Sequence, residues 1–312
     1  MAGYNSAFTG PQIDGALSRA ASGGAIDAAI QAKPNPNLLD NWCFGNPVNQ
    51  RGKTEYINTG NYCIDRWISG ADTAKLESDG LLITAPSSGI VFRQVIEKPE
   101  RLSGKTVTLS IDATVISGNW NLTDVGNFSA QHTDYHINNG VTSWTFQVNS
   151  PSNFGDAVSV GFWGDSENAQ IKVRSIKLEL GSQQTLAHQD ADGNWMLNEI
   201  PDYGEQLARC QRYYRRLYFS YLKFAHYASG VARVGIPING MRTKPSCNII
   251  GTPTCYAEDS WAITSLALGL NVSERTTEME AANVDLVILE GSGAVSNKAV
   301  CNDLLVEVIS DL

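Results

Sequence analysis

Short segments in which apolar residues alternate with polar ones constrain the fold of this chain more than any other feature. A period of two is typical of β-strands that bury one face, because successive side chains point to opposite sides of a strand. The clearest example spans residues 106–115, and the pattern returns at 144–148 and 158–162. In the first of these segments the apolar face consists of Val107, Leu109, Ile111, Ala113 and Val115.

A further strand is expected where the alternation shifts by one residue. Ile171 and Val173 set one phase, and from Ile176 onward the apolar residues follow the other phase. A β-bulge places one extra residue in a strand and so produces such a shift. Because Gly- and Asn-rich turns separate the segments, residues 37–181 are predicted to form a jelly-roll-like β-sandwich in a mainly β protein.

The N-terminal region is predicted to contain a helix over Phe8–Ala32. Ile13 and Leu17 lie four residues apart on one face of it. So short an apolar stripe is not stable alone, so it needs either the rest of the chain or further copies of itself. We favour a bundle of identical helices, which makes residues 1–36 an attachment and oligomerisation segment.

A second helix is predicted after a polar connector, within residues 182–217. Asp202 and Glu205 have the spacing of a capping box. The apolar positions that follow recur at intervals of three, four and three residues, as in a short coiled-coil seam. These positions are Leu207, Cys210, Tyr214 and Leu217.

Residues 218–312 are predicted to form a smaller distal β domain. Its expected strands are Tyr221–Tyr227, Ala232–Ile238, Ala262–Leu270, Val284–Leu289 and Leu304–Ile309. The last two have apolar residues on both faces, and such strands must be covered on both sides by a second sheet or by a neighbouring subunit. This favours an oligomer.

The charge pattern excludes several classes of partner. The formal net charge is −9 and no block of Lys or Arg is present, so we expect neither nucleic-acid binding nor a polybasic membrane contact. No apolar run approaches the roughly 18 residues that a membrane span needs. The first residues lack the features of a signal peptide, so synthesis in the cytoplasm is expected.

The residues that usually carry catalysis do not form a recognisable motif. The chain has no G-x-S-x-G elbow, P-loop, H-E-x-x-H or dinucleotide fingerprint, so we expect no catalytic residue, metal or cofactor. His132 and His136 do not have the setting of a metal pair. The six cysteines lack a C-x-x-C spacing and are expected to be buried apolar residues, although Cys43 with Cys63, or Cys247 with Cys255, could pair if the fold brings them together.

Aromatic residues in polar, turn-like settings are the best candidates for ligand binding. Sugar rings have apolar faces and polar rims, so their sites combine an aromatic platform with carboxylate and amide groups. For each ring the alternative is that it belongs to the core. The candidate ligand-binding residues are Trp120, Asp124, Trp163, Asp165, Tyr256 and Trp261.

Four separated segments resemble those of tail-fibre proteins of bacteriophages and prophages of gut bacteria. They are YNSAFTGPQIDGAL (4–17), NLLDNWCFGNPVNQRGKTEY with YCIDRWISG (37–70), IKVRSIKLELGSQQTLAHQ with IPDYGEQLARCQRYYRRL (171–217), and, less distinctively, GIPINGMRTKPSCNII (235–250). The resemblance implies a homotrimeric fibre on the virion tail, with a carbohydrate-binding-module-like sandwich and a distal domain that contacts the host surface. Its N-terminus would join other tail or baseplate proteins. The chain departs from the family in lacking a long coiled-coil or β-helix shaft.

The leading hypothesis is a non-catalytic receptor-binding protein that recognises glycans on the host bacterial surface and mediates adsorption. Three linked sites would strengthen weak binding by multivalency. One alternative is a tail-associated depolymerase, which needs two carboxylates converging within about 10 Å. Carboxylates of the sandwich such as Asp112, Asp134 and Asp156 are available, but any acidic β domain offers as many. The other alternative is a purely structural tail connector.

Overall fold

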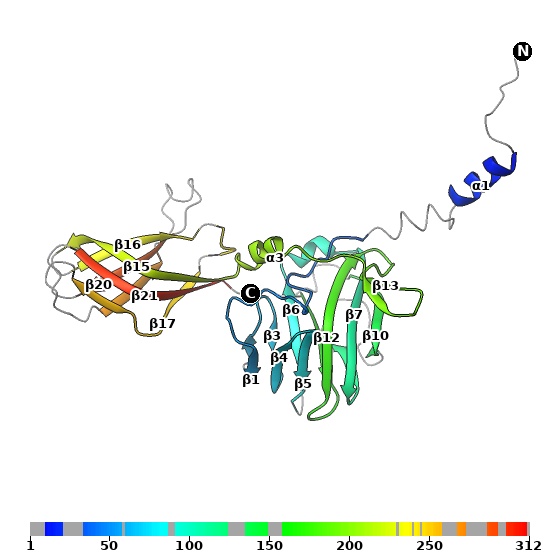
Figure 1. Cartoon of the computed structure of the whole chain (residues 1–312), viewed down its shortest axis with the longest axis horizontal. Coiled ribbons are helices and arrows are strands. Elements are labelled where there is room, and N and C mark those ends of the chain that lie inside the picture. Colours follow the sequence, from blue (N-terminus) through cyan, green and yellow to red (C-terminus); the bar gives the residue numbers. More distant parts are fainter. Residues whose placement is uncertain are drawn as a thin grey trace, which may run out of the picture.

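A computed structural model describes residues 10–20, 34–57, 60–86, 91–123, 135–148, 158–228, 231–238, 240–243, 245–257, 267–272, 286–292 and 298–310. The protein is mainly β, as predicted. Figure 1 shows two β units side by side, with a short helix, α3, at their junction.

The larger unit is a β-sandwich of two six-stranded antiparallel sheets. In spatial order the first sheet contains β1 (Glu55–Ile57), β4 (Thr73–Glu77), β5 (Gly80–Thr84), β12 (Gln170–Leu180), β7 (Thr106–Ser117) and β10 (Gly140–Gln147). The second contains β2 (Asn61–Tyr62), β3 (Ile68–Ser69), β6 (Phe92–Ile96), β11 (Val158–Gly164), β8 (Trp120–Thr123) and β9 (His136–Ile137). Successive strands switch repeatedly between the sheets, so the predicted sandwich is confirmed.

A chain of aromatic rings runs through the sandwich core. The ring centroids of Trp67 and Phe92 are stacked 4.9 Å apart, and Phe44 meets Trp67 edge-on at 5.4 Å. Phe162 lies 5.6 Å from Phe92, and Trp120 lies 6.1 Å from Phe162. All five rings are buried, and such pairs contribute beyond their buried area.

The predicted bulge is present in β12. The register between β12 and β7 shifts between Val173 and Ser175, as the one-residue slip in the sequence indicated. At this point the segment before β1 runs beside β12. Phe44 N donates to Arg174 O at 2.8 Å, and Ile176 N donates to Trp42 O at 3.0 Å. The bulge therefore occurs where a loop segment takes the place of a neighbouring strand.

The polar connector after residue 181 is part of the sandwich rather than a free linker. It contains a hairpin of β13 (Ala187–Gln189) and β14 (Trp195–Leu197). Lys177, which is 0% exposed, pairs with Glu199 at 3.0 Å, and Thr185 N donates to Glu179 at 2.7 Å. This packing was not predicted, because Lys and Glu on the outer face of a strand normally indicate solvent exposure.

The distal unit is built on one seven-stranded antiparallel sheet. Its order is β17 (Ser246–Ile250), β21 (Lys298–Ile309), β15 (Tyr214–Ala228), β16 (Val231–Pro237), β20 (Leu286–Ser292) and β19 (Ala267–Val272), and β18 (Thr254–Ala257) also pairs with β21. The end strands β17 and β19 approach each other, so the sheet curls around its own core. This curl buries Leu304, Val306 and Val308 of β21, while Leu305 and Ile309 on the other face stay partly exposed.

The predicted helical seam after Asp202 is wrong beyond Cys210. The N-cap is confirmed, since the Asp202 carboxylate accepts from Glu205 N at 2.8 Å, and α3 (Tyr203–Cys210) follows. The chain then turns, and Tyr214 and Leu217 belong to β15. β15 pairs along its length with β21, a strand about 90 residues further on, and this long-range pairing overrides a local helical period.

Of the predicted helix Phe8–Ala32, the described part forms α1 (Gly10–Ala20), and the remaining residues lie outside the described ranges. Its stripe residues are exposed, Ile13 by 39% and Leu17 by 63%. In Figure 1 this helix stands away from both β units. Within the described part of the chain, no helix is long and apolar enough to cross a membrane.

Neither of the two suggested cysteine pairs forms. Cys43, Cys63 and Cys247 are free thiols, whereas Cys301 is in a disulfide. Cys63 is buried and its Sγ donates to Trp67 O. Burial raises the pKa of the Cys63 thiol to about 12, so this cysteine acts as a small apolar core residue, as predicted.

Asn41→Ala should destabilise the sandwich by about 2–4 kcal/mol. The Asn41 side chain accepts from Val48 N at 2.7 Å and donates to Val48 O and Asp65 O, both at 2.8 Å. Removing it leaves three buried groups unpaired, and alanine tolerates the positive φ of 53° less well than asparagine. Urea unfolding measures the change. Asn248→Ala, at an exposed strand position, is the control, and equal midpoints for both variants would contradict the prediction.

Candidate glycan-binding face and the junction pocket

Trp120 is a core residue, so its predicted role as a ligand platform is wrong. It is 0% exposed, and its Nε1 donates to Ser117 O at 3.2 Å. The neighbours of Trp120 in sequence are polar, but strand alternation turns its ring inward on β8, toward Phe162.

Trp163 lies on the opposite, outer face of the second sheet. Its neighbours in β11, Phe162 and Gly164, both face the core, since a Cβ on Gly164 would lie within 3.3 Å of Trp120. Trp163 packs against the buried hydrophobic residues of the sandwich but is only partly buried, so it is not fully covered. It remains a candidate platform.

Asp165 links two turns through hydrogen bonds. Its carboxylate accepts from Asn119 N at 3.0 Å and from Asn119 Nδ2 at 2.7 Å, and Asp165 N donates back to Asn119 O. These hydrogen bonds from Asn119 lower the pKa of the Asp165 carboxyl. Both of its oxygens are occupied, so its first role is to hold the turn before β8 against the turn after β11.

The other predicted site residues are not brought together with Trp163. Asp124 and Trp261 lie outside the described residues. Tyr256 belongs to β18 in the distal unit, where its backbone pairs with Val300. Of the predicted residues that the structure describes, Trp120, Trp163 and Asp165 therefore lie in the sandwich and Tyr256 lies in the distal unit.

Strand register places two unpredicted residues beside Trp163. Trp163 pairs with Asn121 of β8, and Asn121 pairs with His136 of β9. Directly paired residues point to the same face, with Cβ atoms about 4.5–5.5 Å apart. We call these three residues the Trp163 row. In the next row Gly161 pairs with Arg93 on one side and with Thr123 on the other, so no side chain rises at its centre.

Asn121 has an unused hydrogen-bond acceptor. The residue is 7% exposed, and its Oδ1 has no hydrogen-bond partner among the described residues. Buried amide oxygens are nearly always paired, so an orphan acceptor next to a tryptophan ring indicates a place for a ligand hydroxyl. In the sequence only the position of Asn121, one residue after a tryptophan, hinted at this role.

A pocket of about 510 Å³ continues from the end of the Trp163 row. His136 lines it together with three asparagines, Asn119, Asn138 and Asn139. Asn139 Oδ1 accepts from Val115 N at 2.7 Å, which holds the turn before β10 in place. In the described part of the chain, no group of three or more His, Cys, Asp or Glu side chains could hold a metal ion.

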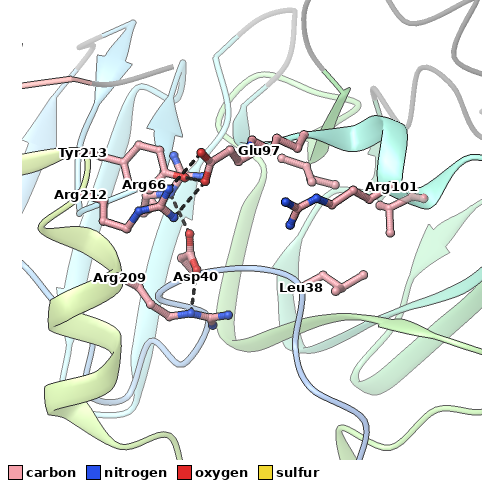
Figure 2. Close-up of a pocket in the computed structure, with 11 residues that line it drawn as sticks. Leu38, Asp40, Arg66, Glu97, Arg101, Arg209, Arg212 and Tyr213 are labelled. Atoms are coloured by element: carbon pink, nitrogen blue, oxygen red, sulfur yellow. Dashed lines mark hydrogen bonds and ion pairs between the residues drawn. The ribbon is translucent and has the colours of Figure 1, made fainter. Parts of the chain in front are cut away.

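A second pocket lies where the two β units meet, and it is rich in charge (Figure 2). Arg66 is 2% exposed, donates from Nε to Asp40 at 3.0 Å and from Nη2 to Val95 O at 2.9 Å, and stacks 3.6 Å above the Tyr213 ring. Glu97 accepts from Tyr213 Oη at 2.7 Å and from Arg212 at 3.0 Å. These contacts tie the sandwich to the start of the distal unit.

No protein-family model matches the chain, and no curated protein matches it. Among solved structures, it is similar to xylanase 10C from Cellvibrio japonicus in complex with xylopentaose, with a TM-score of 0.29 and 13% identity over 50% of this chain and 31% of that one. The xylan-binding module CBM15 is similar with a TM-score of 0.28 and 12% identity, over 48% of this chain and 97% of that one. The tandem CBM22 domain of Paenibacillus barcinonensis Xyn10C is similar with a TM-score of 0.27 and 9% identity, over 88% of this chain and 98% of that one. At such TM-scores the similarities support no conclusion about function.

The Glu97 contacts should make the stability of the protein depend on pH in the acid range. Burial alone would raise the pKa of the Glu97 carboxyl, but the hydrogen bonds from Tyr213 and Arg212 outweigh it and lower the pKa below its ordinary value of 4.5. A carboxyl whose pKa is lower in the folded state stabilises the fold above its unfolded pKa, and this stabilisation is lost as the pH falls through the folded pKa.

Glu97→Gln should therefore lower the melting temperature at pH 7 and flatten its fall below about pH 4.5. Thermal unfolding followed from pH 7 to pH 3 measures both effects. Glu100→Gln, an exposed position three residues along, is the matched control. If the two variants show the same pH profile as the unmodified protein, Glu97 does not stabilise the junction.

Proposed function

We propose that this protein is a non-catalytic glycan-binding protein and that the Trp163 row on the outer face of its sandwich is the binding surface. The observation that carries the proposal is the pairing of a partly exposed tryptophan with a buried amide whose Oδ1 lacks a partner. An indole ring stacks on the C–H face of a sugar, and the amide accepts from a hydroxyl at its rim.

The surroundings of the row favour a neutral sugar lying flat against the sheet. Gly161 leaves the adjacent row without a central side chain, and a Cβ there would lie 2.8 Å from Phe92 O. His136 and the asparagines of the adjoining pocket offer polar groups for further hydroxyls. No group of the Trp163 row or of the adjoining pocket carries a fixed charge, whereas Arg93, which pairs with Gly161 in the next row, is cationic.

The charged groups of the described residues give no support to a depolymerase. A glycoside hydrolase needs one carboxyl with a raised pKa to act as an acid. The four carboxyls whose pKa departs clearly from its ordinary value, in Asp79, Glu97, Asp165 and Asp190, are all shifted downward. Each is held in its charged form by hydrogen bonds, as a structural carboxylate is.

Trp163→Ala should reduce glycan binding by about 30-fold, since truncating a central aromatic residue in a binding site commonly costs 2 kcal/mol or more. Asn121→Ala should weaken binding less, by about tenfold. The measurement is a screen of the full chain against neutral capsular and cell-wall oligosaccharides from gut bacteria, followed by titration calorimetry on those that bind.

Tyr203→Ala is the control for the loss of an exposed aromatic ring, because Tyr203 is 45% exposed on α3 and outside the row. It should leave the affinity unchanged. Equal binding by the Trp163→Ala variant and the unmodified protein would remove the row from the site. The absence of any binding sugar would favour the structural-connector alternative.

At a finer level we propose that glycan binding serves host recognition, with the chain as part of a trimeric bacteriophage tail fibre. The resemblance of four segments to tail-fibre proteins supports this role. The exposed stripe of α1, with Ile13 and Leu17, supports a helix that packs against copies of itself. Three chains would present three Trp163 rows, and their combined binding would exceed that of one site.

The solution mass of the full chain, measured by light scattering, should be close to three times the chain mass of 33.8 kDa. The Ile13→Glu/Leu17→Glu variant should shift toward the mass of one chain, because charged residues in the stripe oppose helix association. Asp14→Glu, on the same helix, is the control. A monomeric mass for the unmodified protein would contradict the fibre proposal and leave glycan binding to be judged separately.

A further inference from the structure

The junction pocket is unusual in its charge. Its volume is about 260 Å³, and five cationic side chains line it: Arg66, Lys98, Arg101, Arg209 and Arg212. Asp40 and Glu97 are the acidic side chains that line it. Five positive and two negative charges leave a formal excess of three positive charges, in a chain whose net charge is −9. A concave site of one sign concentrates ions of the other sign.

The two carboxylates are fully occupied by three of the arginines. Asp40 pairs with Arg66 at 3.0 Å and with Arg209 at 3.5 Å. Glu97 holds Arg212 at 3.0 Å and also accepts from the Tyr213 hydroxyl. Three arginines against two carboxylates account for one of the three excess charges, and the other two come from the remaining two cations.

Lys98 and Arg101 are those two cations, and both come from the segment just after β6. Arg101 belongs to the 3₁₀ helix Pro99–Leu102, and Lys98 precedes it. Both side chains are exposed, and neither has an acidic partner among the described residues. In Figure 2 the Arg101 side chain reaches from this helix into the pocket.

A buried donor at the pocket gives an independent indication of a missing acceptor. Arg66 Nη1 has no hydrogen-bond partner among the described residues, although Arg66 is 2% exposed. The Tyr213 ring beneath the guanidinium attracts its charge but supplies no lone pair for this N–H. Buried donors are normally paired, so this N–H is available to an oxygen of a ligand.

We propose that the junction pocket binds the oxyanion group of an acidic glycan, with Arg101 and Lys98 as the residues that recognise it. Arginine matches the planar geometry of a carboxylate or a phosphate with two parallel hydrogen bonds. Leu38, Ile96 and Leu102 line the pocket as well, and they suit the apolar face of a sugar ring. The volume is just below that of typical ligand sites and fits one acidic sugar.

This site is separate from the Trp163 row and does not depend on it. The row would bind a neutral sugar through stacking, whereas the junction pocket would bind charge. A glycan with both kinds of sugar could use both sites. The oxyanion could come from a uronic acid or from a phosphate-linked polymer, and the choice of probe distinguishes the two sources.

The test is titration calorimetry of the full chain with glucuronate, glycerol 3-phosphate and glucose. Glucuronate or glycerol 3-phosphate should bind and glucose should not, and higher salt should weaken the binding. Glucuronate alone would assign a carboxylate ligand, and glycerol 3-phosphate alone would assign a phosphate ligand. If neither anion binds, the proposal is overturned.

The Lys98→Gln/Arg101→Gln variant should lose at least about tenfold in affinity for the anion that binds. Both positions are exposed, so the fold should persist, and circular dichroism checks it. Lys105→Gln, an exposed lysine that does not line the pocket, is the matched control and should bind normally. Unchanged affinity in the double variant would overturn the assignment.

Trp163→Ala separates this proposal from the previous one. It should leave anion binding within about twofold of the unmodified protein, because no residue of the Trp163 row lines the junction pocket. If Trp163→Ala abolished anion binding while the double variant kept it, acidic glycans would bind at the row and the junction site would be disproved.

Discussion

The arrangement of the two β units depends on the partners that they supply to one buried cation, Arg66. A guanidinium taken out of water is costly unless acceptors surround it. Arg66 finds them in Asp40, in Val95 O at the end of β6, and in the face of Tyr213, where the distal unit begins. Three segments far apart in the sequence must converge to provide these groups. The same convergence creates the junction pocket, so one electrostatic constraint both joins the units and forms a site between them.

The two candidate sites use opposite physical means. The Trp163 row offers an apolar ring and an amide acceptor on a sheet face, which suits neutral sugars. The junction pocket offers a positive field and arginine donors, which suits oxyanions. Both belong to the sandwich or its border, whereas the predicted candidate Tyr256 belongs to the distal unit. Together the sites would let one protein recognise a glycan by both shape and charge.

Prediction from the sequence was most reliable where the pattern was local and repeated. It located the strands β7, β10, β11 and β12, the bulge in β12 and the Asp202 cap, each of which depends on neighbouring residues. It was wrong for Trp120, whose polar neighbours concealed an inward-facing ring, and for the helix end at Cys210. It treated residues 181–201 as a connector because their composition is polar, and Lys177 and Glu179 gave no sign that this segment packs on the sandwich. Each of these errors concerns a residue whose burial or pairing depends on a segment far away in the sequence.

The sequence by itself determined the strand periods, the turns between them and the excess of acidic charge, because these follow from the order of neighbouring residues. Only the tertiary structure decided which side of β8 faces inward, that Asn121 stands beside Trp163, and that Lys98 and Arg101 share a pocket with Arg66. The physical reason is that a strand's alternation defines two faces without saying which is covered. Burial is decided by segments far away along the chain. The candidate binding groups lie on the surfaces that these segments do not cover.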